Sequence, residues 1–175
     1  MSRITPMSLP NERFPSGSWL NGARRGAEQR VGEGGEIAWP RPALRCVPAQ
    51  GVAERLAQSV ASQGPDSWDP LVLVERLRIP VRYQPLRAAE GGLEAAIVSS
   101  LDHEFEIVCD EWLPDQDSDR LRFRVAHELA HTLFFNWSDN PPSRVSERTD
   151  EEERFCDEFA EALLAESERL PPSDY

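Results

Sequence analysis

Two of the three histidines in this 175-residue chain lie four positions apart, in the segment His127-Glu128-Leu129-Ala130-His131. On an α-helix this spacing places both imidazoles on one face, one turn apart, where both can reach a single Zn²⁺ ion. Glu128 follows His127 directly, so its carboxylate lies beside such an ion and can take a proton from a metal-bound water. The segment therefore demands a helix that is buried except for one polar window.

The residues around the histidines fit such a helix. On a helical wheel, the polar side chains of Arg124, His127, Glu128 and His131 share one sector. The remaining broad arc is apolar and comprises Leu121, Val125, Ala126, Leu129, Ala130, Leu133 and Phe134. The simpler interpretation, two surface histidines on an amphipathic helix, would leave both without a further ligand.

A catalytic zinc has three protein ligands and an open position for water, so a third ligand is expected from elsewhere. A second helix is predicted over about Asp150 to Ser167, with an apolar stripe made of Phe155, Cys156, Phe159, Ala160, Leu163 and Leu164. Glu153 falls inside this stripe, and an inward carboxylate must be paired or bind a metal. Asp157, one turn further, can accept a hydrogen bond from the non-metal nitrogen of a ligating histidine.

Glu152 also falls within the apolar sector, so it stays open as an alternative ligand. We nevertheless expect Glu152→Ala to have little effect on metal affinity or activity. The simpler interpretation of all these acids is that they favour the amino terminus of the helix through its dipole.

The order of the other segments predicts an α+β fold, with a small antiparallel three-stranded sheet packed on the two helices. Helices are predicted over about Gln50 to Gln63 and Leu71 to Leu77. Alternating β-runs follow at 81–84, 93–99 and 104–109, which favour an antiparallel meander. Residues 1 to about 47 are rich in glycine and proline and predict a flexible tail, which leaves 48–175 as the domain.

Charge and cysteine content restrict the partners and the compartment. The net charge is −12 and every basic residue is arginine, so nucleic acid and membrane surfaces are unexpected partners. Cys46, Cys109 and Cys156 are few, odd in number and far apart, which favours reduced, buried thiols. No secretory signal or spanning segment is recognisable, so we expect a cytoplasmic protein.

The segment from about Pro70 to Leu164 resembles the ImmA/IrrE family of zinc metallopeptidases. Two motifs carry the resemblance: the run 120–123 before the His127 to His131 motif, and the later pattern Glu153-x-x-Cys156-Asp157-x-Phe159-Ala160-x-x-Leu163-Leu164. The resemblance implies a zincin-like fold of the gluzincin type, in which His127, His131 and Glu153 bind one Zn²⁺ and Glu128 is the base. The chain departs from the family pattern at Ala130, at Cys156 and after Leu164, which affects substrate recognition more than chemistry.

The expected function is zinc-dependent cleavage of one regulatory protein, since members of the family often cleave a helix-turn-helix repressor. A substrate peptide could add as a strand to the edge of 104–110, at Glu106, Ile107 and Val108. His103 could stabilise an oxyanion, although a surface histidine is the simpler interpretation. The alternative function is a non-catalytic, zinc-containing module that binds a regulator, which would have no need of Glu128.

Overall fold

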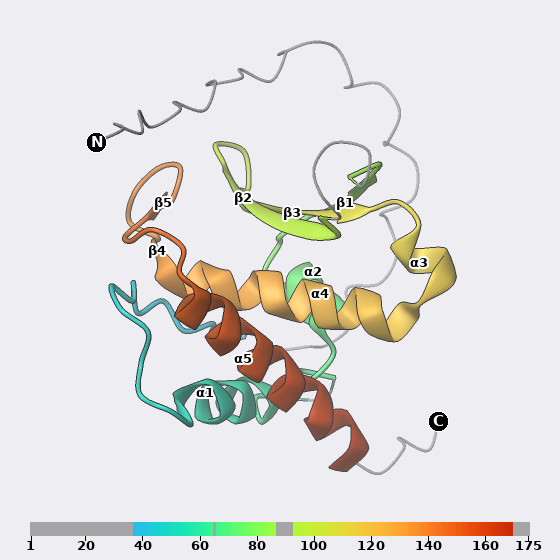
Figure 1. Ribbon diagram of the computed structural model, residues 1–175, viewed down its shortest axis with the longest axis horizontal. Helices are drawn as coiled ribbons and strands as arrows, with labels where there is room; N and C mark the ends of the chain where they lie inside the picture. Colours follow the sequence, from blue (N-terminus) through green and yellow to red (C-terminus); the bar gives the residue numbers. More distant parts are fainter. Residues whose placement is uncertain (1–36, 65, 87–92, 170–175) are drawn as a thin grey trace, which may run out of the picture. The chain divides into compact units, whose positions relative to one another are not determined.

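The helix that carries both motif histidines, α4 (Ser118–His131), lies between a β-sheet and the longest helix, α5 (Asp150–Arg169) (Figure 1). The computed structural model describes residues 37–64, 66–86 and 93–169, which belong to a compact unit that begins at Gly34. The fold is mixed α+β, as predicted. Its other elements are α1 (Val52–Ala61), α2 (Pro70–Arg76), β1 (Val81–Gln84), β2 (Ala95–Ser100), β3 (Glu104–Asp110), α3 (Leu113–Gln116), the 3-10 turn η1 (Thr132–Phe134), β4 (Phe135–Asn136) and β5 (Ser143–Arg144).

Local signals explain where α4 begins and which residues it buries. The side chain of Asp117 caps the helix by accepting a hydrogen bond from the backbone N–H of Arg120 at 2.9 Å. Leu121, Val125 and Leu129 lie in the core. In the last two turns the polar side chains of His127, Glu128 and His131 are buried as well as the apolar ones. The helix is therefore buried on all sides at the motif.

The sheet differs from the predicted antiparallel meander. Its strand order is β1-β3-β2, with β2 antiparallel to β3 and β1 parallel to it. The prediction assumed that β1 and β2 pair directly, but ten residues separate Gln84 from Ala95, which is enough chain for β3 to lie between them. The central strand β3 buries Phe105, Ile107 and Cys109 completely.

The boundary of the predicted tail is also corrected. Residues 1–36 lie outside the described part of the chain, but 37–47 pack on the core instead of extending from it. Ile37 and Trp39 are each 6% exposed. The indole N–H of Trp39 donates to Thr132 Oγ1 at 2.9 Å, and its ring contacts Phe159 edge-on at 5.9 Å between centroids. Two apolar side chains among glycines and prolines carry no periodicity, which is why the pattern missed them.

The two amino-terminal helices agree closely with their predictions. Helix α2 begins at Pro70 after Asp69, whose side chain accepts from the N–H of Leu71 at 2.9 Å. Helix α1 packs on α5, and α2 packs on α4. Cys109 and Cys156 are buried free thiols as expected, whereas Cys46 is exposed. Among the described residues, no helix is both long and apolar enough to cross a membrane.

Candidate metal centre

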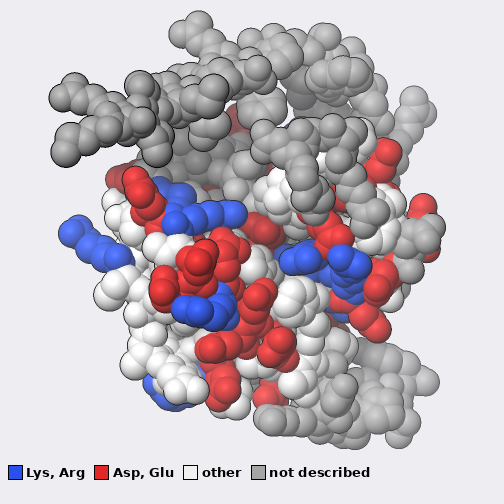
Figure 2. All heavy atoms as spheres, viewed as in Figure 1, with Lys and Arg blue, Asp and Glu red and all other residues white. Residues whose placement is uncertain are grey.

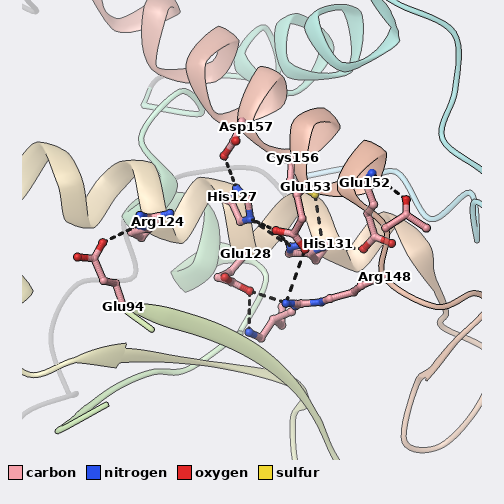
Figure 3. A network of polar contacts seen from close by, with 12 residues as sticks. Glu94, Arg124, His127, Glu128, His131, Arg148, Glu152, Glu153, Cys156 and Asp157 are labelled. Carbon is pink, nitrogen blue, oxygen red and sulfur yellow. Dashed lines mark hydrogen bonds and ion pairs between the residues drawn. The ribbon is translucent and has the colours of Figure 1, made fainter. Parts of the chain in front are cut away.

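Three side chains that the sequence predicted as ligands converge between α4 and α5. His127 and His131 extend from α4, and Glu153 extends from the first turn of α5 (Figure 3). The two Nε2 atoms are 3.1 Å apart, and Glu153 Oε2 lies 3.2 Å from His127 Nε2 and 3.6 Å from His131 Nε2. Ligand atoms of these three residues could hold a metal ion.

The other ring nitrogens decide what the converging atoms offer. His127 Nδ1 lies 2.8 Å from Asp157 Oδ1, as predicted for a residue that orients a ligating histidine. His131 Nδ1 lies 2.7 Å from Glu152 Oε1. Because carboxylates accept, we assign both Nδ1 atoms as donors, which leaves a lone pair on each Nε2. Two such lone pairs and a carboxylate oxygen repel one another unless a cation lies among them.

The contacts of Glu152 argue against the expectation that its replacement has little effect. Its side chain is buried, accepts from His131, and accepts from Arg144 Nη2 at 2.7 and 2.6 Å. Burial raises the pKa of Glu152, but the hydrogen bonds from His131 and Arg144 outweigh burial and hold the pKa below its ordinary value. Glu152 is therefore a charged group that orients His131, as Asp157 orients His127.

Glu128 lies beside the cluster and is not one of its three members. Its side chain is buried, and its Oε2 accepts from the backbone N–H of Ile97 in β2 at 2.8 Å. Arg148, from the loop before α5, places Nη2 at 3.7 Å from the same oxygen and Nη1 at 3.9 Å from Glu153 Oε1. The carboxylate of Glu128 therefore lies between the edge of the sheet and a cation.

Both buried cysteines lie near these negative charges and stay protonated. Burial raises the pKa of Cys109 to about 12, with a further contribution from the charge of Glu128. Cys156 Sγ lies 3.4 Å from His131 Nδ1, and burial together with the charges of Glu152 and Glu153 raises its pKa well above its ordinary value. Neither thiol is a ready nucleophile or thiolate ligand.

The structure does not bring the residues predicted to bind substrate into this site. Strand β3 is the central strand and is paired on both sides over 107–110, so it offers no free edge there. Ile107 is fully buried, and Glu106 pairs with Arg82 at 2.6 Å. Val108 is half-buried on the central strand. The prediction chose the wrong strand because the sheet order was wrong. His103 is exposed in the turn between β2 and β3, where it lines a surface hollow with Arg41 and Asn140.

Three residues of the site escaped the sequence analysis: Ile97, Arg144 and Arg148. Ile97 takes part through its backbone, which no side-chain pattern reveals. The two arginines had a usable signal, because they are the basic residues closest before a run of four acids that begins at Asp150. On the face that Figure 2 displays, acidic side chains cover more of the surface than basic ones do.

Comparisons of the chain with protein families, with curated proteins and with solved structures found no match.

Proposed function

We propose that this protein is a zinc-dependent endopeptidase with a zincin-like site of the gluzincin type, as the resemblance to the ImmA/IrrE family implies. The observation that carries the proposal is the triangle of His127 Nε2, His131 Nε2 and Glu153 Oε2. Its sides measure 3.1, 3.2 and 3.6 Å. Ligand atoms about 2.0 to 2.1 Å from a tetrahedral Zn²⁺ are about 3.3 to 3.4 Å from one another, so the triangle has the size that zinc requires.

The donor set supports zinc over harder cations. Two imidazole nitrogens and one carboxylate oxygen are typical of a catalytic zinc site, whereas Mg²⁺ and Ca²⁺ prefer oxygen ligands throughout. When bound, the ion would polarise the scissile carbonyl and acidify a water molecule. Asp157 and Glu152 hold the two imidazoles so that Nε2 of each faces the ion.

Glu128 has the position of the general base. It is adjacent to His127, lies outside the ligand triangle and is held on the side of β2 by the N–H of Ile97. The carboxylate would take the proton of the attacking water and later deliver it to the departing amine. The amide of a glutamine could also accept from the N–H of Ile97 but could not take a proton, so the carboxylate favours an enzyme over a zinc-containing scaffold.

The outer edge of β2, with which no described strand pairs, replaces β3 as the expected place for a substrate strand. Asp110 N–H donates to Glu94 C=O at 2.8 Å, so even-numbered residues of β2 direct their backbone groups toward β3. Odd-numbered residues therefore direct theirs away, and Ile97 N–H does so toward Glu128. A peptide that adds to this edge passes next to the base and the ligand triangle.

The substrate class remains the one that the resemblance implies, a single regulatory protein such as a helix-turn-helix repressor. A protein substrate suits such a sheet edge, because the edge forms hydrogen bonds with the backbone of an extended peptide segment. The net charge of −12 disfavours direct binding to nucleic acid, so the regulator would be engaged as a protein.

The test compares wild type with Glu128→Gln. Both should retain about one zinc per chain in element analysis, because Glu128 is not a ligand. In a lysate of the source cells, wild type should generate new protein amino termini that mass spectrometry detects, and Glu128→Gln should generate them at least about 10² times more slowly. Asp119→Asn, which removes a charge from an exposed site on α4, is the matched control and should act like wild type.

Each alternative result removes part of the proposal. Without bound zinc in the wild type, the metal site is wrong. With zinc bound but no new termini, or with equal cleavage by Glu128→Gln, the peptidase is wrong. The scaffold function would then take its place if both proteins still captured the same partner.

A further inference from the structure

Arg148 is the arginine in contact with both the base and a ligand carboxylate. Its guanidinium reaches from the loop before α5 to a position between Glu128 and Glu153 (Figure 3). Its side chain is 42% exposed, whereas that of Glu128 is 6% exposed. The cation therefore lies at the solvent side of a buried carboxylate.

Arg144, in β5, and Arg148, in the loop that follows it, are held in different ways. Arg144 donates to Glu152 at 2.6 and 2.7 Å, so this contact occupies its Nη2 group. Arg148 has ion pairs of 3.7 and 3.9 Å, longer than hydrogen bonds, and none of the described residues accepts a hydrogen bond from it. Its donors are free for a ligand, while its charge is held at the site by two carboxylates.

Peptide hydrolysis is faster when such a donor acts beside the ion that polarises the carbonyl. When water attacks the carbonyl carbon, the π-bond electrons move to the carbonyl oxygen, which becomes negatively charged. The ligand triangle consists of acceptors, and Glu128 is an acceptor too. His103, the earlier candidate, lines a surface hollow to which no member of the triangle contributes among the described residues.

We propose that Arg148 is the oxyanion stabiliser of this site: its guanidinium donates a hydrogen bond to the oxygen of the scissile carbonyl as negative charge develops on it. This inference rests on the proposed peptidase function and deepens it. The water oxygen bonds to the carbonyl carbon while Glu128 takes the water proton. The carbon–nitrogen bond then breaks, the amine receives that proton, and Arg148 keeps its own protons throughout.

The test uses phenylphosphonate, a tetrahedral anion that resembles the charged intermediate, as the probe. Its dissociation constant from the zinc-loaded full chain is measured by calorimetry. Arg148→Ala should weaken phenylphosphonate binding about 10 to 100-fold, which is the loss expected for one hydrogen bond between charged groups. The dissociation constant of Arg148→Lys should lie between those of wild type and Arg148→Ala. Arg154→Ala is the matched control, because Arg154 carries the same charge on α5 but is 68% exposed and pairs with Glu151.

Zinc affinity, measured by competition with a chelator, separates this role from a structural one. If Arg148 merely positioned Glu153, Arg148→Ala would release zinc more readily and the zinc-loaded protein would bind phenylphosphonate as before. That result, or equal losses in Arg148→Ala and Arg154→Ala, overturns the inference. If wild type cleaves protein while Arg148→Ala cleaves equally fast, the inference is wrong and the peptidase stands. If wild type holds no zinc, both are wrong.

Discussion

Replacing Glu152 by alanine should cost this protein more stability than its place in a run of surface acids suggests. The change removes one hydrogen bond of 2.7 Å from His131 and two of 2.7 and 2.6 Å from Arg144. The Glu152 side chain is 2% exposed and that of Arg144 is 25% exposed, so Arg144 recovers only part of its hydration. Removing one partner of a buried charged pair costs about 3 to 5 kcal/mol, and we expect a value near the lower limit.

The assay is thermal unfolding followed by circular dichroism with a chelator present, so that loss of metal contributes nothing. A destabilisation of about 3 kcal/mol corresponds to a melting temperature lower by about 10 °C in a domain of this size. Glu151→Ala is the matched control, since Glu151 lies one position earlier on α5 and its side chain is 63% exposed. Equal melting temperatures for the two variants would refute the reasoning that burial and three charged hydrogen bonds distinguish Glu152.

Two further predictions concern the ion pairs of Glu94 with α4 and the amino-terminal segment before Val47. Burial raises the pKa of Glu94, but hydrogen bonds from Arg120 and Arg124 outweigh it and lower the pKa from 4.5. The stability that Glu94 contributes is therefore complete above about pH 4.5 and is lost as the pH falls through the lower folded-state pKa. Urea unfolding should show Glu94→Gln less stable than wild type at pH 7, and this difference should shrink as the pH falls below about 4.5; a difference that stays constant with pH would contradict this. A chain that starts at Val47 should melt about 10 °C below one that starts at Gly34, because the loss of a buried tryptophan such as Trp39 costs about 3 to 5 kcal/mol. Equal melting temperatures would mean that residues 37–46 add no stability, as the predicted tail boundary implies.

The parts of the site that a helical period governs were predictable. The four-residue spacing of His127 and His131 and the positions of Glu153 and Asp157 follow from 3.6 residues per turn. The helical period placed both Glu152 and Glu153 in the apolar sector, because neighbouring residues are 100° apart and the exact rotation of α5 depends on its packing against α4 and α1. The prediction chose Glu153, which the structure brings to the two histidines, but it gave no role to Glu152, which contacts His131.

The pairing of strands that are far apart in the sequence was harder to predict. The three β-runs were placed correctly, yet their order depends on which connection crosses over which strand, and local alternation contains no such information. For the same reason the substrate edge was predicted on β3, whereas β2 is the outer strand of the described sheet. Trp39 and Arg148 lie in irregular segments, where no period relates one side chain to the next.

Glu94 has a consequence for how this protein could be redesigned. Its C=O accepts from Asp110 of β3 at 2.8 Å, while its carboxylate accepts from Arg120 and Arg124 of α4 at 2.6 to 2.9 Å. One residue thus anchors the start of β2 to the sheet and to the helix at once. The alignment of Ile97 with Glu128 therefore depends on Glu94 as well as on the residues of the metal centre. A change at Glu94 would shift the position of Glu128 from outside the site.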